Sequence, residues 1–212
     1  MLETQLILNF KRILQSLNIR PKGVLHIGAN VGEEANIYAE MGINNVLWIE
    51  GNADLIPALN ANISRYTGQK SLCALIGDAD GEKVNFNISS NGGQSSSVLA
   101  LGTHKQQHPD VSYVRHVPGV TRRIDCLLIE EEIKNYDFLN VDLQGYDLNA
   151  IKGMGDYLKY FRAANIEVNT TPVYEGCALL PEVEAYMATF GFRLIQTRFL
   201  PNCSWGDGIF VK

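Results

Sequence analysis

Short apolar runs alternate with segments of helical periodicity along this chain, and no other feature limits its possible folds so strongly. Four runs have the length and apolar content of buried strands: Lys22–Gly28, Asn45–Glu50, Phe138–Leu143 and Ala163–Val168. Segments with apolar residues at helical spacing separate them. Strands separated in this way form a parallel sheet through right-handed crossovers. The alternation therefore predicts a doubly wound, Rossmann-like α/β fold.

Weaker patterns supply the remaining elements. Further strands are predicted at Ser71–Ile76, Val84–Ile88, Arg193–Thr197 and Gly208–Val211. Helices are predicted at Glu33–Met41, Asp54–Tyr66 with Asp54 as its N-cap, Ile124–Ile133, Leu148–Tyr160 and Pro181–Phe190. Residues 1–20 are predicted to hold an amphipathic helix that covers the sheet, because apolar residues recur there at helical spacing: Leu6, Phe10, Ile13, Leu14 and Leu17.

The length of 212 residues favours one domain, and 46% hydrophobic with 19% charged residues is typical of a packed core. We therefore interpret residues 1–212 as a single domain. Residues 89–118 depart from the alternation, since they begin with a polar run and show no strong periodicity. A long irregular segment in a compact domain is typical of a functional loop. We expect an insertion or lid loop there.

Charge and composition exclude several classes of protein. The chain has 18 Lys and Arg against 23 Asp and Glu, a net charge of −5 that repels polyanions, so a nucleic-acid partner is not expected. No apolar run approaches the roughly 20 residues that span a bilayer, and the N-terminus does not resemble a signal peptide. The four cysteines lie far apart, which is typical of free thiols in a reducing compartment. We expect a cytoplasmic protein.

Side chains suited to ligand binding stand where the predicted strands end. In an open α/β sheet, ligands bind at the carboxyl ends of the strands. The turn GANVG after the first strand lets the main chain approach a ligand at Gly28 and Gly32. Glu50 ends the next strand, and its carboxylate can accept hydrogen bonds from two vicinal ribose hydroxyls. This arrangement predicts a nucleoside-binding site.

The identity of the nucleoside follows in part from charge. The dinucleotide fingerprint would need glycines where this chain has Asn30 and Glu33, and no phosphate loop ending in GK[ST] is present. Glu33 and Glu34 at the helix start would repel a phosphate. S-adenosylmethionine has a ribose, no phosphate and a sulfonium cation that an acidic rim attracts. We predict it as the cofactor, bound by Gly28, Ala29, Asn30, Gly32, Glu50, Asp78 and Asp142.

Several motifs then resemble, in order, those of the FkbM family of S-adenosylmethionine-dependent methyltransferases. They are HIGANVG at 26–32, WIEGN at 48–52, ALIGDADGE at 74–82, the serines at 95–97 and FLNVDLQGYDLNAIKG at 138–153. The resemblance extends from about residue 20 to 170. It implies the class I methyltransferase fold, a mostly parallel seven-stranded sheet with an antiparallel last strand. It also implies O-methylation of a hydroxyl on a sugar or secondary metabolite.

The chain departs from the two main motifs of the family, which usually read DVGAN and KIDVEGHE. His26 stands in place of the Asp, Gln144 in place of the Glu and Tyr146 in place of the His. The residues Gly28, Asn30, Gly32, Glu50, Asp142 and Gly145 are kept. The cofactor assignment depends on the kept residues, and the catalytic details depend on the changed ones.

Methyl transfer from a sulfonium is an in-line displacement, so the protein must position the acceptor oxygen behind the methyl group and remove its proton. We predict that Asp142, with Glu167 or His26, serves the acceptor. Each residue has a plainer alternative. Asp142 would cap the following helix, Glu167 would be a solvated rim carboxylate or a partner for Arg162, and His26 would be a buried structural histidine.

Other assignments stay open at this point. Asp142, Glu167 and Asn169 could hold Mg²⁺ that lowers the pKa of the acceptor hydroxyl, although we favour the metal-free route. The chain could also be a non-catalytic nucleoside-binding module. The acceptor is expected to be a small molecule or a glycan. An amide or base N-methyltransferase is not supported, because DLQG stands where its [DN]PP[YFW] motif would follow the strand.

Two further groups of residues could bind ligands. His104 and His108 would share one helix face as zinc ligands do, but we favour surface histidines. The serines 95–97, with Asn91 and Gln94, are typical of a flexible loop, and their hydroxyl and amide groups could also bind a sugar.

Overall fold

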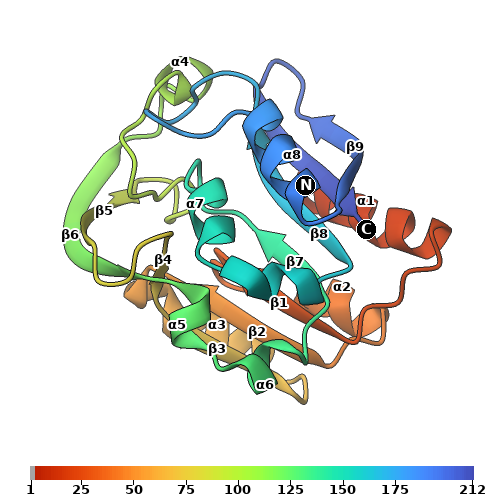
Figure 1. The fold of residues 1–212 in the computed structure, drawn as a ribbon. Helices are drawn as coiled ribbons and strands as arrows, with labels where there is room; N and C mark the ends of the chain where they lie inside the picture. The colour runs from red at the N-terminus through yellow and green to blue at the C-terminus, as the bar shows by residue number, and fades with distance from the viewer. Residues whose placement is uncertain (1–2) are drawn as a thin grey trace.

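The computed structural model describes the main chain of residues 3–212 and the side chains of residues 10–212. Its main sheet has seven strands in the order β3-β2-β1-β7-β8-β10-β9 (Figure 1). The strands are β1 Gly23–Ile27, β2 Asn45–Glu50, β3 Gln69–Cys73, β7 Phe138–Val141, β8 Ala163–Asn169, β9 Arg193–Phe199 and β10 Trp205–Val211. In this sheet β10 alone runs in the direction opposite to the other strands. The predicted class I fold is confirmed.

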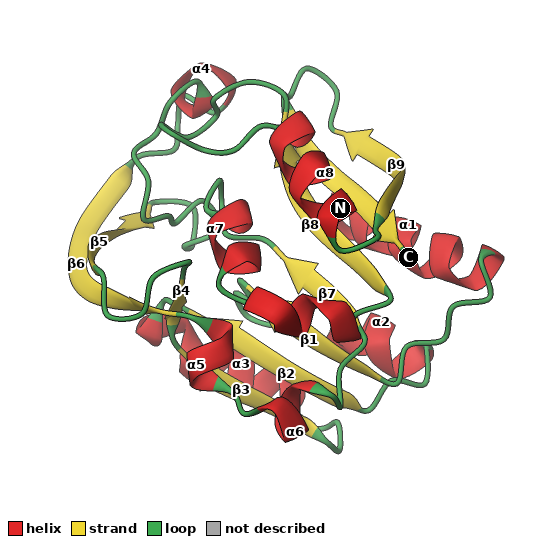
Figure 2. Cartoon of the chain, viewed as in Figure 1, coloured by secondary structure: helices red, strands yellow, loops and turns green. Residues whose placement is uncertain are grey.

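Helices cover both faces of the sheet (Figure 2). One face packs against α1 Glu3–Ser16, α2 Ala35–Glu40 and α3 Ile56–Ile63, which follows the 3-10 turn η1 Ala53–Leu55. The other packs against α5 Ile124–Leu127, α6 Glu130–Ile133, α7 Asp147–Lys152, the 3-10 helix η2 Gly155–Tyr160 and α8 Leu180–Thr189. Every residue of β1, β7 and β8 is buried. This double cover explains why these strands read as continuous apolar runs.

The first helix packs on the sheet through Phe10, whose ring lies 5.3 Å from that of Phe138 and 5.9 Å from that of Tyr38 between centroids. The side chain of Leu6, another apolar residue of this helix, lies outside the described residues.

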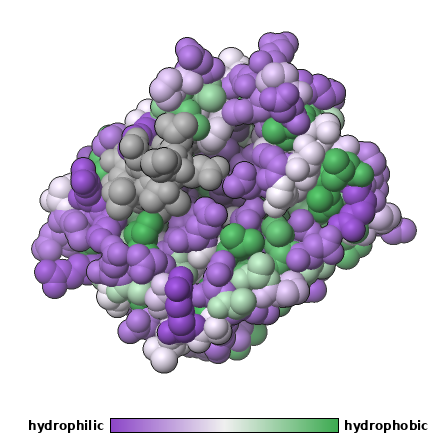
Figure 3. All heavy atoms as spheres, turned by 180° about the vertical axis from the view of Figure 1, so that it is seen from behind, coloured by the Kyte–Doolittle hydropathy of each residue, from purple (hydrophilic) through white to green (hydrophobic). Residues whose placement is uncertain are grey.

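Within the described part of the chain, no helix is long and apolar enough to cross a bilayer. The far side of the molecule carries mostly hydrophilic side chains, with apolar ones in small groups (Figure 3).

Three predicted elements are divided in the structure. The predicted strand Ser71–Ile76 separates at Ala74, because β4 Leu75–Ile76 leaves the main sheet to pair with another strand. The predicted helix Ile124–Ile133 breaks where Leu128 and Ile129 adopt extended main-chain angles. The predicted helix Leu148–Tyr160 stops at Lys152, and the chain continues as η2.

The N-cap prediction for the helix after β2 was also wrong by two residues. The side chain of Asn52, rather than that of Asp54, provides the cap, because its Oδ1 accepts from the Asp54 main-chain N–H at 3.1 Å. Asp54 itself pairs with Arg115.

The segment expected to be irregular up to Pro118 instead contains a strand. β6 Tyr113–Arg122 pairs antiparallel with β5 Lys83–Ser89, beside the main sheet (Figure 1), and the short helix α4 His104–Gln107 precedes it. Proline disfavours a strand because it cannot donate to the ladder. Here Pro118 lies opposite Asn85 of β5 on one side of β6. On the other side, β4 does not extend as far as Pro118, so no strand there requires a hydrogen bond from its main-chain nitrogen.

Gly28 joins the ends of three strands. Its φ angle is +85°, and a Cβ atom there would lie 1.7 Å from the main-chain oxygen of Asp142, just after β7. Its N–H donates to the Ile49 carbonyl of β2 at 2.9 Å. Any side chain at Gly28 would therefore separate the turn after β1 from the end of β7.

We expect Gly28→Ala to destabilise the protein far more than Gly81→Ala does. Gly81 has nearly the same φ, +82°, but a Cβ atom there meets nothing within 4 Å. The control should therefore cost only the left-handed main-chain strain, about 1–2 kcal/mol. Gly28→Ala adds a main-chain clash, worth about a further 1–3 kcal/mol. Urea unfolding of both variants measures the difference, and equal losses would contradict the close contact.

Candidate active site

A cavity of about 540 Å³ opens where β1, β2, β7 and β8 end. Most of the residues predicted from the sequence line it: His26, Gly28, Ala29, Asn30, Glu50, Asp142 and Glu167. Gly32, Asp78 and Asn169 do not. A Cβ atom on Gly32 would meet Leu59 Cδ1 at 2.7 Å, so this glycine allows α3 to pack closely. The main-chain oxygen of Asp78 accepts from Arg123 Nη1 at 2.7 Å.

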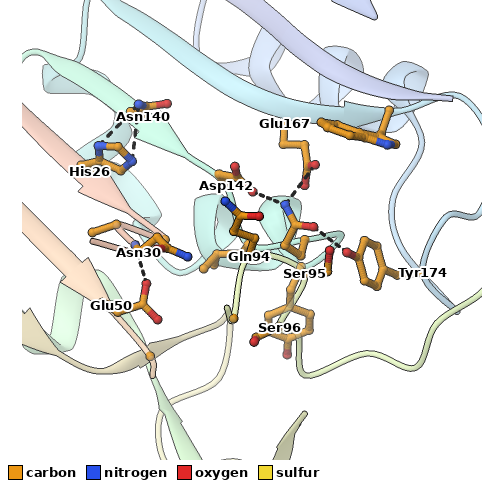
Figure 4. Close-up of a pocket in the computed structure, with 18 of the residues that line it drawn as sticks. His26, Asn30, Glu50, Gln94, Ser95, Ser96, Asn140, Asp142, Glu167 and Tyr174 are labelled. Carbon is orange, nitrogen blue, oxygen red and sulfur yellow. Dashed lines mark hydrogen bonds between the residues drawn. The ribbon is translucent and has the colours of Figure 1, made fainter. Parts of the chain in front are cut away.

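On the β2 side of the cavity, the Glu50 carboxylate fixes two loops, and Figure 4 shows its bond to Asn30. Its Oε2 accepts from the Asn30 main-chain N–H at 2.7 Å, and its Oε1 accepts from that of Asn52 at 2.6 Å. Glu50 is buried, and this burial raises the pKa of its carboxyl although both amides lower it. A carboxylate has about four acceptor positions, so these bonds leave acceptor capacity for a ligand.

On the opposite side, Gln144 holds the carboxyl groups of Asp142 and Glu167 together; Figure 4 labels these two acids and Tyr174, to which its dashed hydrogen bonds lead. Its Nε2 donates to Asp142 Oδ1 at 2.6 Å and to Glu167 Oε1 at 3.2 Å, and its Oε1 accepts from Tyr174 Oη at 2.5 Å. The main-chain oxygen of Gln144 accepts from Ser97 Oγ at 2.8 Å. Gln144 is therefore fixed from both ends.

The two carboxyl groups titrate above their ordinary ranges. Burial raises the pKa of Glu167 strongly, and the nearby charge of Asp142 raises it further. Asp142 faces the open cavity, yet the protein around it excludes enough water to raise its pKa, against the lowering by Gln144. Two acids that interact so closely lose their protons in separate steps, so the pair favours a state with one negative charge.

The plainer alternatives for these two acids were wrong. Arg162 approaches Asp137 at 3.9 Å, not Glu167, and Glu167 is buried instead of solvated. The turn before α7 is held by Asp147, which accepts from the main-chain N–H groups of Leu143 and Gly145 at 2.8 and 3.0 Å. Asp142 is thus free of a capping role, and its carboxylate lies at the cavity.

His26 lies under the cavity, deep in the sheet. Its Nδ1 is 3.1 Å from Tyr38 Oη, its ring stacks on Trp48 with centroids 4.7 Å apart, and burial lowers its pKa to about 3. A ring held neutral by its surroundings is a poor proton acceptor at neutral pH. This placement favours the structural alternative for His26.

Sequence reasoning missed a row of polar residues beside His26. Asn140 and Asn165 lie at the same level of β7 and β8, and Asn165 Nδ2 donates to Asn140 Oδ1 at 3.0 Å and to Asp207 Oδ1 at 3.2 Å. Burial raises the pKa of Asp207 to about 7. The sequence signal that could have revealed this row is Asp207, an acid inside the otherwise apolar strand WGDGIFV.

The serine segment forms an ordered wall of the cavity. Ser95, Ser96 and Ser97 are buried, and the main-chain N–H of Ser95 donates to Ser89 Oγ at 3.1 Å. His104 is buried against Ser95, with Nε2 and Oγ 3.1 Å apart, so the prediction of a surface histidine was wrong there. No group of three His, Cys, Asp or Glu within the described residues is placed to hold a metal ion.

Comparison with known proteins gives one family and one fold. The profile of the family described as "Methyltransferase FkbM domain" matches residues 26–194. Hexuronic acid methyltransferase AglP of Haloferax volcanii is 24% identical over 147 residues, which cover 68% of this chain and 54% of that protein. The chain therefore spans about half the length of this relative.

Two solved structures share the fold at about 10% identity. Magnesium protoporphyrin IX methyltransferase (ChlM) from Synechocystis PCC 6803 has a TM-score of 0.57, over 99% of this chain and 79% of that one. The methyltransferase domain of bacterial-CtHen1-CN has a TM-score of 0.55, over the whole of both chains. Because the family profile covers most of the sequence, the chain belongs to the FkbM family of S-adenosylmethionine-dependent methyltransferases.

Proposed function

We propose that this protein transfers a methyl group from S-adenosylmethionine to a hydroxyl of a sugar, glycan or secondary metabolite, with residues 1–212 acting as one domain. The observation that carries the proposal is one cavity with two unlike sides. The Gly28–Glu50 side suits a nucleoside, and the Asp142–Gln144–Glu167 side suits removal of a proton. The name of the curated relative, a hexuronic acid methyltransferase, supports a sugar acceptor.

The nucleoside side fits S-adenosylmethionine better than a phosphate-bearing cofactor. We propose that Gly28, Ala29 and Asn30 contact it through the main chain and that Glu50 accepts from its ribose hydroxyls. Glu33 and Glu34 also line the cavity, and Glu33 would repel a phosphate. Burial raises the pKa of Glu34 to about 8, so this group is mostly neutral at pH 7. S-adenosylmethionine supplies an electrophilic methyl group when bound. The solved ChlM structure, described with this cofactor bound, supports the same choice.

The Asp142–Gln144–Glu167 side of the cavity would take up the proton of the reacting hydroxyl. Asp142 carries the base role in our proposal, because its carboxylate faces the cavity and takes a hydrogen bond from Gln144. Glu167 would share the proton through its coupling to Asp142. Gly32 and Asp78, predicted for the cofactor, and His26, predicted for the acceptor, have no direct role in this proposal.

The magnesium alternative is less well supported by the donor set. Asp142 and Glu167 lie at the cavity, but Asn169, the third predicted ligand, does not line it. We therefore keep the metal-free route. A non-catalytic nucleoside-binding module would bind the cofactor without turnover, so consumption of S-adenosylmethionine with any acceptor separates the two.

We expect S-adenosylmethionine to bind and NAD and ATP to bind far more weakly, because the cavity presents acids where phosphates would lie. Calorimetric titration of the full chain with all three compounds measures this. Tight binding of NAD or ATP, without binding of S-adenosylmethionine, would contradict the assignment of the nucleoside side.

We expect Glu50→Gln to weaken binding of S-adenosylmethionine roughly 10- to 150-fold, the size of a lost hydrogen bond to a charged group. Glutamine is chosen over alanine because Glu50 is buried and also holds the amides of Asn30 and Asn52. Glu131→Gln, an exposed acid on α6, removes the same charge elsewhere and should leave the affinity unchanged. An unaltered dissociation constant in Glu50→Gln would remove Glu50 from the ribose site.

We expect Asp142→Asn to lower turnover by roughly 10²- to 10⁴-fold, the range for loss of a general base. In the unsubstituted protein, turnover should rise with pH, because the protonated pair cannot accept a proton. The midpoint of this rise in turnover should lie at a pH above 3.8, the ordinary pKa of Asp, since the pKa of both acids is raised. A pH profile of kcat tests this. Turnover that vanishes with a chelator and returns with Mg²⁺ would instead favour the metal route.

A further inference from the structure

Two acidic side chains face each other across neighbouring strands at one corner of the cavity. Asp207 of β10 is the direct antiparallel partner of Glu167 of β8, so both side chains emerge on the same face of the sheet. Directly opposed residues have Cβ atoms roughly 5 Å apart, and like charges at this spacing are destabilising. Trp205 precedes Asp207 by two residues, so it projects to the same face. We call Glu167, Asp207 and Trp205 the acid corner.

All three residues of the acid corner line the cavity. The Trp205 ring is held in place, since its Nε1 donates to His108 Nε2 at 3.2 Å. Glu167 is only 4% exposed, and its Oε2 has no hydrogen-bond partner. A buried carboxylate oxygen without a partner is costly, and ligand binding is one way to satisfy it. The unfilled Oε2 position is a geometric observation that adds to the proximity of the two acids.

The surroundings of the acid corner offer little compensating charge. The cavity is lined by six acids and, among the described residues, by no Lys or Arg: Glu33, Glu34, Glu50, Asp142, Glu167 and Asp207. Arg198 of β9 is the register partner of Asp207 and lowers its pKa, but burial outweighs this effect. Asn165 donates a hydrogen bond to Asp207. Neither Arg198 nor any other cation reaches the cavity wall formed by described residues.

We propose, on the basis of the function proposed above, that the acid corner binds a protonated amine of the methyl acceptor. The acceptor would then be an amine-bearing hydroxyl compound, such as an amino sugar, and not a uronic acid. An ammonium group has three donors, which match Glu167 Oε2 and the Asp207 carboxylate. Trp205 adds a cation–π contact. A carboxylate or phosphate on the acceptor would face acids that have little compensating charge, which opposes binding.

The inference is tested with three sugars of one ring type: glucosamine, glucose and glucuronate. Each is titrated into the full chain saturated with S-adenosylhomocysteine, and binding is followed by saturation-transfer NMR. We expect glucosamine to bind about tenfold or more tightly than glucose, and glucuronate more weakly than both. Equal affinities, tighter binding of glucuronate, or binding by none of the three would overturn the inference.

Variants locate the effect at the acid corner. Asp207→Asn and Trp205→Leu should each reduce the glucosamine preference over glucose by about tenfold. Glu184→Gln, an exposed acid on α8, should keep the preference. A preference unchanged in both corner variants would overturn the assignment, and urea unfolding shows that each variant is folded.

Methyl transfer to the same sugars, measured separately, keeps the two proposals apart. Transfer that favours glucuronate would leave the proposed function standing and remove the amine contact. Binding that follows the expected order, without transfer to any hydroxyl acceptor, would leave the amine contact standing and remove the proposed function.

Discussion

The structure depends on a main-chain contact between the turn after β1 and the end of β7. Gly28 touches the Asp142 carbonyl, where no side chain could fit, and the Asp142 N–H donates to Ile27 at 2.9 Å. The Gly28 N–H donates to Ile49 of β2. Three strand ends are thus joined within one turn. This contact brings Glu50 and Asp142 to opposite sides of one cavity, although 92 positions separate them in the sequence.

The same region concentrates acidic groups whose burial works against stability. The pKa of Asp147 rises to about 8 and that of Asp207 to about 7, mainly through burial. A folded-state pKa above the unfolded one means that each group favours unfolding as pH rises through that interval. Hydrogen bonds offset part of this cost: the main-chain N–H groups of Leu143 and Gly145 donate to Asp147, and the Asn165 side chain donates to Asp207. Such a local conflict with stability is expected where side chains serve chemistry.

The strongest patterns in the sequence predicted the elements that are buried on both sides. β2 has the predicted bounds, and β1, β7 and β8 differ from theirs by two residues or fewer, because a double helical cover demands continuous apolar runs. Partly exposed elements were less predictable. β6 was missed, since most of its residues are exposed and its proline is tolerated only because β4 stops short of it. The division of the helix after Arg123 was also hidden, because Leu128 and Ile129 are apolar in either conformation.

The sequence by itself determined the main parallel strands, the family and the glycine turn after β1, because each depends on residues close together in the chain. The glycines at 28 and 32, the acid at 50 and the motif at 138–153 carry that information locally. Only the tertiary structure decided which acids share the cavity. Asp207 became a partner of Glu167 through antiparallel pairing across 40 residues, and His26 proved to be enclosed by Tyr38 and Trp48. Burial and opposition of charges arise from strand pairing, which is not encoded at any single position.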